Sequence, residues 1–213
     1  MIIALAHDKG GVGKTTTALN LAEILKPDII IDQDTHNNLV ILNQLRAEND
    51  QLNVLSNLNK SELINALSKS AQGLLILVDC GGFDSELNRI AIAASDLTIV
   101  PANDDINEVI GLKRFNKTLA QISADMGEKI IGHVMFNRVH HSRKNFNDVE
   151  SFIASKDGEH LKRLDTVVPT SKWHGVAALD GYGVTNHKKT KYSDAARRIK
   201  ALATEIKTKL NIK

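Results

Sequence analysis

Short apolar runs alternate with stretches in which apolar residues recur every three or four positions along this 213-residue chain. The apolar run at 2–6 leads through a glycine-rich segment into Ala18, Leu21, Ala22 and Leu25, which have the spacing of one helix face. Because strands that alternate with helices form parallel sheets, the pattern predicts an α/β fold with a mostly parallel, twisted sheet and helices on both faces. Further strands are expected at 28–32, 52–55, 74–79, 97–101, 129–136 and 166–169, and further helices near 39–45, 61–72, 85–94, 107–126, 147–156 and 192–210.

A single domain spanning residues 1–213 is expected, because 42% of the residues are hydrophobic and no linker, repeat or low-complexity tract interrupts the pattern. No apolar run has the length of a membrane span, and the glycine-rich segment arrives before a signal peptide is complete. The single cysteine, Cys80, excludes a disulfide framework and a paired-cysteine iron–sulfur site within the chain. These features favour a protein of the reducing cytosol.

Residues 8–16 read Asp-Lys-Gly-Gly-Val-Gly-Lys-Thr-Thr and lie between the first predicted strand and the first predicted helix. Glycines let several backbone N–H groups converge on a phosphate, the helix N-terminus and Lys14 add positive charge, and the Thr15 hydroxyl can bind Mg²⁺. A turn that merely joins strand to helix is the structural alternative. The Lys-Thr-Thr ending in this context favours a phosphate loop, although Asp8 stands where the ordinary pattern has glycine. The predicted nucleotide-binding residues of the loop are Gly10, Gly11, Val12, Gly13, Lys14, Thr15 and Thr16.

Polar side chains stand at the ends of three other predicted strands: Asp32 and Asp34, Asp79, and Asn137. In open parallel sheets ligands bind outside the carboxyl ends of the strands, so we expect these side chains to surround the phosphate loop. Asp79 ends an apolar strand, and we expect it to hold Mg²⁺ through water. A strand-end acid exposed to solvent is the structural alternative.

A second lysine, Lys9, lies inside the loop, and the octet Lys-Gly-Gly-Val-Gly-Lys-Thr-Thr resembles the deviant Walker A loop of the ParA/MinD superfamily of dimeric ATPases. The resemblance implies a phosphate-loop NTPase architecture, ATP and Mg²⁺ as cofactors, and slow Mg²⁺-dependent hydrolysis of ATP to ADP and phosphate. It also implies a homodimer that closes on ATP, in which Lys9 reaches the nucleotide of the partner. Because Lys14 already serves the chain's own phosphates, we expect the Lys9 charge to point outward, where only a second subunit offers it a partner.

Asp32 and Asp34 resemble the second acidic motif of that family, in which two acids flank one residue and Pro-Gln follows; here the motif continues with Thr35 and His36. The resemblance implies that Asp34 orients the attacking water and that Asp32 lies nearer the metal. Positioning and charge neutralisation do most of the work in such an attack on the γ-phosphate. The predicted catalytic residues are therefore Lys9, Lys14 and Asp34, and the predicted metal ligands are Thr15, Asp32 and Asp79.

Asn137 and Pro169 match two adenine-binding positions of the family, an asparagine that hydrogen-bonds the edge of the base and a proline in the loop that packs on it. A turn asparagine and a proline that ends a strand are the structural alternatives, and the sequence leaves both pairs of interpretations open.

Charge is unevenly distributed, since residues 1–132 hold 11 Lys and Arg against 17 Asp and Glu, whereas residues 133–213 hold 16 against 8. The basic C-terminal third indicates either a surface that binds a polyanion or a solvated face. The chain is similar to short partition ATPases that lack an N-terminal helix-turn-helix, which implies a cytoplasmic, nucleoid-associated protein. Its ATP-bound dimer would bind DNA non-specifically, and a centromere-binding, ParB-like adaptor would stimulate hydrolysis and release. The candidate DNA-binding residues are Arg138, Arg143, Lys144, Lys172, Lys188, Lys189, Lys191, Arg197, Arg198 and Lys200.

Two alternatives belong to other functional classes. A MinD-like protein that positions a complex at a membrane would use the stripe Ile199, Leu202, Ile206 and Leu210 as an amphipathic surface helix. This stripe lacks Trp and Phe and fits a helix that packs on the core, so a membrane partner is not expected. A metabolic ligase or reductase of the same fold is the other alternative, and Lys9 and the lone cysteine argue against it.

Overall fold

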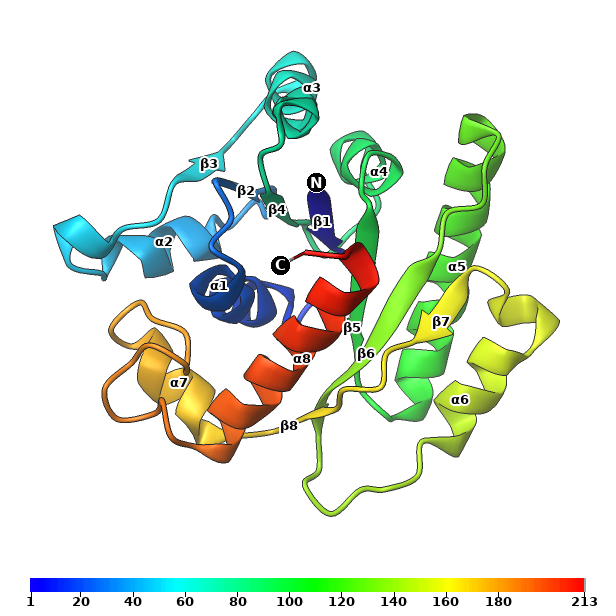
Figure 1. The fold of residues 1–213 in the computed structure, drawn as a ribbon. Helices are drawn as coiled ribbons and strands as arrows, with labels where there is room; N and C mark the ends of the chain where they lie inside the picture. The colour runs from blue at the N-terminus through cyan, green and yellow to red at the C-terminus, as the bar shows by residue number, and fades with distance from the viewer. Residues whose placement is uncertain (213) are drawn as a thin grey trace.

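The protein is organised around an eight-stranded sheet in which every strand pairing is parallel, in a computed structural model that describes residues 1–212 (Figure 1). The strand order is β3-β2-β4-β1-β5-β6-β7, and β8 also pairs with β6. The strands are β1 (Ile2–Leu5), β2 (Ile29–Asp32), β3 (Val54–Ser56), β4 (Ile76–Asp79), β5 (Leu97–Ala102), β6 (Gly132–Val139), β7 (Leu161–Arg163) and β8 (Val168–Pro169). The α-helices are α1 (Lys14–Leu25), α2 (Asn38–Gln44), α3 (Lys60–Ser68), α4 (Glu86–Ala93), α5 (Ile106–Met126), α6 (Asn147–Ala154), α7 (Lys172–Ala178) and α8 (Asp194–Leu210).

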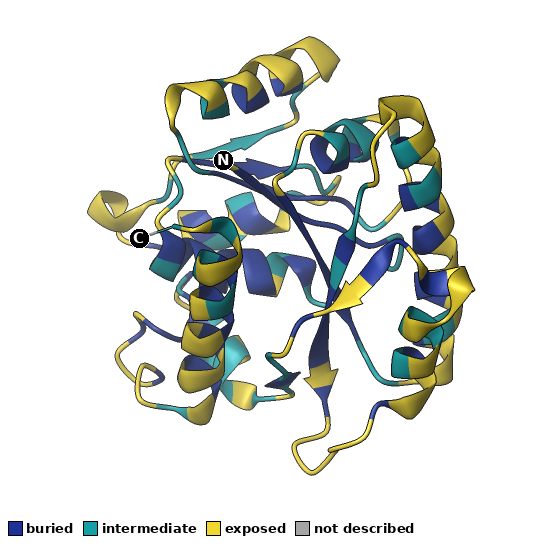
Figure 2. Ribbon diagram, turned by 45° about the vertical axis from the view of Figure 1, so that its right-hand side comes forward, coloured by how far each residue is buried: buried dark blue, intermediate teal, exposed yellow. Residues whose placement is uncertain are grey.

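Helices cover both faces of the sheet because successive strand side chains point to opposite faces and most of them are apolar. In β1, Ile2 and Ala4 belong to the core under α3, α4, α5 and α6, whereas Ile3 and Leu5 belong to the core under α1, α2, α7 and α8. The central strands are buried along their length, and exposed positions gather on the outer faces of the helices (Figure 2). The predicted α/β fold, with a parallel sheet between two layers of helices, is confirmed.

The structure departs from the expected elements mainly in the last 85 residues or so. Strand β6 extends to Val139, so Asn137 lies inside a strand and not at the strand end where it was expected. Strand β7 was not predicted, because it is a short edge strand in which Leu161 is the buried position and two basic residues follow. Helix α7 was not predicted either, because it is seven residues long and contains Gly175.

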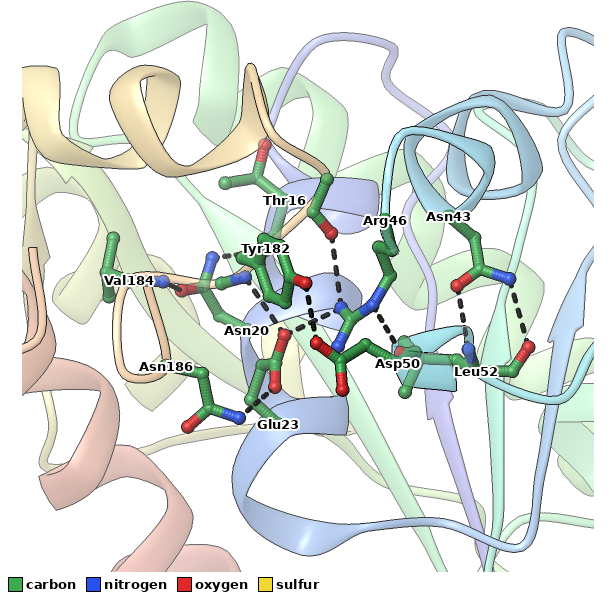
Figure 3. A network of polar contacts seen from close by, with 12 residues as sticks. Thr16, Asn20, Glu23, Asn43, Arg46, Asp50, Leu52, Tyr182, Val184 and Asn186 are labelled. Atoms are coloured by element: carbon green, nitrogen blue, oxygen red, sulfur yellow. Dashed lines mark hydrogen bonds and ion pairs between the residues drawn. The ribbon is translucent and has the colours of Figure 1, made fainter. Parts of the chain in front are cut away.

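A buried ion pair connects α1 to the segment after α2 and to the loop after α7. The Nη1 atom of Arg46 lies 2.7 Å from Oε1 of Glu23, and the two side chains are 4% and 2% exposed. Glu23 also accepts hydrogen bonds from the backbone N–H of Gly183, at 3.2 Å, and from the side chain of Asn186. The Tyr182 ring lies 4.5 Å from the Arg46 guanidinium carbon, and Figure 3 shows these side chains converging. Several partners therefore compensate both charges for the loss of water.

Replacing Arg46 by alanine leaves the Glu23 carboxylate buried without its countercharge. We expect Arg46→Ala to lower the free energy of unfolding, measured by urea denaturation, by about 3–5 kcal/mol. Lys60→Ala is the control, because Lys60 and Glu86 form an ion pair whose side chains are 57% and 68% exposed. An exposed pair contributes at most about 1 kcal/mol. Equal losses in the two variants would contradict the importance assigned to the buried pair.

Candidate functional site

The phosphate loop leaves β1 and turns into α1 with the backbone that its glycines permit. Gly11 and Gly13 have φ angles of 78° and 94°, in the left-handed region that favours glycine. The Lys14 side chain is buried, and its Nζ atom donates to the carbonyl oxygens of His7, at 3.2 Å, and Lys9, at 3.1 Å. Burial lowers the pKa of Lys14, and nearby carboxylates, Asp79 foremost, oppose this shift. The ammonium is thus held against the loop by carbonyl oxygens that a phosphate would replace.

Strand β6 brings two side chains onto the loop. The Asn137 amide nitrogen donates to the Val12 carbonyl at 2.8 Å, and the Arg138 guanidinium donates to the Gly11 carbonyl. A Cβ atom at Gly13 would lie 2.5 Å from the Asn137 amide nitrogen, so the close approach also requires glycine there. Asn137 therefore holds the loop in place. This role was not predicted, since the sequence indicated only a contact with adenine.

A cavity of about 220 Å³ lies beside the loop, between α1, β6 and the segment that leads into α7. It brings together the two positions predicted to bind adenine, Asn137 and Pro169, with Gly13 of the loop. His174 also lines it and was not predicted; burial lowers the pKa of its imidazole. The complete lining is Gly13, Thr16, Thr17, Asn20, Asn137, Arg138, Val168, Pro169, Thr170, Ser171, His174 and Ile199.

The two buried acids at the strand ends have different surroundings. Asp32 accepts hydrogen bonds from the backbone N–H groups of Asp34, Leu39 and Val40, at 3.0, 3.0 and 3.2 Å, so both of its oxygens are engaged. Neither oxygen of Asp79, which is fully buried, has a hydrogen bond of good geometry within residues 1–212. Burial raises the pKa of Asp79 to about 7.

Asp34 lies in the turn that follows β2 and is half-buried. Its Oδ1 atom accepts a hydrogen bond from the backbone N–H of His36 at 2.9 Å, which fixes the side chain in an Asx turn. Asp34 lies close enough to Lys14 and Asp79 to influence the pKa of each. The predicted water-orienting acid is therefore placed near the predicted metal site.

The donors at this site fit Mg²⁺. The ion prefers oxygen ligands and keeps several of its waters, so one or two carboxylates and a hydroxyl from the protein are enough. The unsatisfied oxygens of Asp79 lie near Thr15, whose side chain lowers the pKa of Asp79, and these two residues would hold the ion. Asp32 fits less well, because backbone groups already occupy both of its oxygens. Within residues 1–212 no cluster of three or more His, Cys, Asp or Glu side chains offers a cage for a metal.

The structure corrects the expectation for Lys9. Its Nζ atom lies 3.0 Å from Oε2 of Glu108 and 3.9 Å from Oδ1 of Asp105, and its side chain is 33% exposed. The expectation that the Lys9 charge lacks a partner in its own subunit is therefore wrong. Neither periodicity nor motif spacing indicates this contact, because Glu108 is 99 residues away and lies on another element.

The candidate DNA-binding residues separate into two sets. In the first set Arg138 contacts the phosphate loop, Arg143 contacts Asp104 at 2.8 Å, and Arg197 pairs with Asp194 on the same helix. All ten candidates are exposed, and Lys172, of the second set, lies over the Trp173 ring. The second set is Lys144, Lys172, Lys188, Lys189, Lys191, Arg198 and Lys200.

Known proteins share this sequence pattern. The sequence model of a family described as an AAA domain matches residues 1–73, which include the phosphate loop, Asp32 and Asp34. The chain is 26% identical to the protein ParA of Rhizobium radiobacter over 65% of this chain and 64% of that protein, and so spans just under two thirds of that relative. It is also 26% identical to the chromosome-partitioning ATPase Soj of Thermus thermophilus, over 96% of this chain and 94% of that protein.

Solved structures share the fold. A chain of the MinC:MinD cell division protein complex of Aquifex aeolicus superposes with a TM-score of 0.73 at 18% identity, over 98% of this chain and 96% of that chain. A Cyanothece McdA variant in complex with ATP gives 0.71 at 17% identity, over 100% and 96%. The septum site-determining protein MinD of Pyrococcus horikoshii, complexed with Mg-ADP, gives 0.66 at 18% identity, over 99% and 97%.

A parallel sheet with a glycine loop and a buried, unsatisfied aspartate at its carboxyl edge defines a phosphate-loop NTPase. The extra lysine of the loop, Lys9, and the likeness to ParA and Soj point to one subclass of these proteins. In sequence and fold the chain is similar to the deviant Walker A ATPases of the ParA/MinD type.

The raised pKa of Asp79 predicts a pH-dependent stability. With a pKa of about 7 in the folded protein against 3.8 ordinarily, the folded state binds more protons than the unfolded chain between these values. The stability contribution of this group therefore falls as the pH rises through that window, and the full penalty is present above it. We expect Asp79→Asn to raise the melting temperature of the nucleotide-free protein more at pH 8 than at pH 5. It should also remove the additional stabilisation by Mg²⁺ with ATP, and an equal effect at both pH values would contradict the assignment.

Proposed function

We propose that this chain is a ParA-type ATPase for the partition of plasmid or chromosomal DNA, acting as a single ATPase domain. The observation that carries the proposal is an exposed basic tract, Lys188, Lys189 and Lys191, in a chain whose loop has the deviant lysine. Arg198 and Lys200 add exposed charge on the adjoining helix α8. Such a surface neutralises DNA phosphates without reading sequence.

The nucleotide site supplies the switch in this proposal. The Lys14 ammonium exchanges the carbonyls of His7 and Lys9 for the β- and γ-phosphates of ATP, and Thr15 and Asp79 hold Mg²⁺. The ion, when bound, neutralises charge on the phosphates. Asp34 orients the attacking water, while Asp32 fixes the segment that carries Asp34 through its backbone hydrogen bonds. The base occupies the cavity beside the loop.

ATP binding is then coupled to the closure of two subunits face to face, with Lys9 reaching the partner's nucleotide. The closed dimer binds DNA, and a centromere-binding adaptor stimulates hydrolysis and so releases it. The likeness to ParA and to the chromosome-partitioning ATPase Soj supports this assignment. A location at the nucleoid, in the cytoplasm, is part of this proposal.

Helix α8 bears on the membrane-positioning alternative. Its apolar residues Ile199, Leu202 and Ile206 are at most 1% exposed, since they pack on the sheet. A helix that uses its apolar face for the core has none left to insert into lipid. In residues 1–212 no helix is both long enough and apolar enough to span a bilayer. These observations favour DNA over a lipid surface as the partner.

Binding to random duplex DNA with ATP, with ADP and without nucleotide tests the proposal. We expect binding with ATP alone, a steep loss of affinity as salt increases, and no binding by Lys14→Ala, which cannot hold the phosphates. A variant with alanine at Lys188, Lys189 and Lys191 should keep ATP binding but lose most DNA affinity, whereas Lys60→Ala should resemble the wild type. Sedimentation with anionic liposomes runs in parallel. Binding to liposomes without binding to DNA would replace the proposal by the membrane alternative.

Asp34 generates a separate prediction about turnover. If its carboxylate orients water, Asp34→Ala should bind ATP and dimerise but lose at least about 100-fold in hydrolysis rate, the scale of a lost general acid or base. The variant should consequently stay on DNA after ATP addition, as measured by the dissociation rate. Normal phosphate release from Asp34→Ala would move the role to another residue.

A further inference from the structure

Glu108 is a fully buried carboxylate in the first turn of α5 with two partners from the phosphate loop region. One oxygen lies 3.0 Å from the Lys9 ammonium, and the other lies 2.8 Å from Nε2 of His7. Burial alone would raise the pKa of Glu108, but His7, Lys9 and the backbone of Asn103 outweigh it and lower the pKa. The carboxylate is therefore ionised, and Lys9 is its cationic partner.

His7 lies against that carboxylate on the side away from Lys9. The backbone N–H of Lys9 donates to Nδ1 of His7 at 2.9 Å, so in the neutral ring Nδ1 is unprotonated and the proton is on Nε2, which faces Glu108. The His7 ring stacks on Phe115 with centroids 5.6 Å apart. A Cβ atom at Gly111 would lie 3.1 Å from the His7 ring, so α5 approaches it closely. The carboxylate is thus closely packed on its His7 side, and its second oxygen contacts Lys9.

We propose that Glu108 is a positioning residue for Lys9, which holds the ammonium in its own subunit and must release it before Lys9 can reach the nucleotide of a second subunit. The first part concerns the monomer alone; the second rests on the proposed function. A phosphate of another subunit that draws the ammonium away from Glu108 breaks the intramolecular pair. The two contacts therefore compete, and the intramolecular pair raises the ATP concentration needed for closure.

The surroundings of the pair show where a second subunit would approach. Asp105 lies 3.9 Å from the Lys9 ammonium and is 47% exposed, so it lies on the solvent side of the pair. Ile106 and Ile110, on the same end of α5, are 64% and 53% exposed. Exposed apolar side chains around a charged pair are typical of a surface that another chain covers. A second copy of the chain that covers this end of α5 would contact Lys9 on the solvent side of the Lys9–Glu108 pair.

Glu108→Gln tests the proposal with little change in shape. The amide oxygen is expected to face the proton on His7 Nε2, which leaves the NH₂ group towards Lys9 and removes its acceptor. We expect half-maximal dimerisation, measured by light scattering, at an about tenfold lower concentration of a non-hydrolysable ATP analogue. The control Asp105→Asn keeps an acceptor for the helix N-cap and should shift this concentration by less than about twofold. Lys9→Ala should bind the analogue as a monomer and not dimerise.

Chemical labelling tests the monomer part without nucleotide. With an amine-reactive reagent, Lys9 of the wild type should react several-fold more slowly than the exposed Lys60, and Glu108→Gln should remove the difference. Equal rates for Lys9 and Lys60 in the wild type would overturn the proposal even if Glu108→Gln fails to fold. A Glu108→Gln protein that dimerises only at the wild-type concentration or above would overturn the release step. A wild type that never dimerises would instead contradict the proposed function, and the labelling result would still decide the Lys9–Glu108 contact.

Discussion

The parallel register of three neighbouring strands is the constraint on which the site depends. Leu5 at the end of β1 pairs with Asp79 at the end of β4, and Asp79 pairs with Asp32 at the end of β2. The phosphate loop therefore leaves the sheet directly beside both acids. A shift of one residue in β4 would turn Asp79 to the opposite face, away from the loop. The helical layers on both faces then exclude water from these strand ends, and this exclusion gives the charges there their unusual properties.

Buried charges in this protein are of two kinds, and the difference separates scaffold from site. Glu23 and Arg46 have several partners each, and Asp32 has three backbone N–H groups. Asp79, by contrast, has unsatisfied oxygens and a raised pKa, and the nearby Lys14 has a lowered one. Both shifts favour the neutral forms, because burial penalises charge. Phosphates and a divalent cation would supply the countercharges that the polypeptide leaves out, so part of their binding energy comes from relieving this cost.

Lys9, at the edge of the site, is also a charged group whose partner depends on what is bound. In an isolated subunit the Lys9 ammonium lies on a buried carboxylate, and in the proposed dimer it lies on the phosphates of another subunit. Both partners are anionic, so either can bind the ammonium. A lysine with two alternative anionic partners can respond to a nucleotide, whereas a lysine in open solvent would have no contact to give up.

The order and type of most elements follow from the amino-acid sequence alone, because apolar periodicity reflects which side of each segment faces the core. The sequence also determined the phosphate loop, since strand, glycine turn and helix are adjacent in the chain, and it located Asp32, Asp34 and Asp79 from the ends of apolar runs. The short elements β7 and α7 were not predicted, because they have little apolar periodicity.

The hydrogen-bond and ion-pair partners of the polar groups depend on the tertiary structure. The pairing of Lys9 with Glu108, the engagement of Asp32 by the backbone of α2, and the donation from Asn137 to the loop join residues far apart in the chain. His174 also lines the cavity together with residues that are far away in the chain. Periodicity and motif spacing carry no information about such contacts, because they depend on the distance between elements after the sheet has formed and not on the order of residues along the chain.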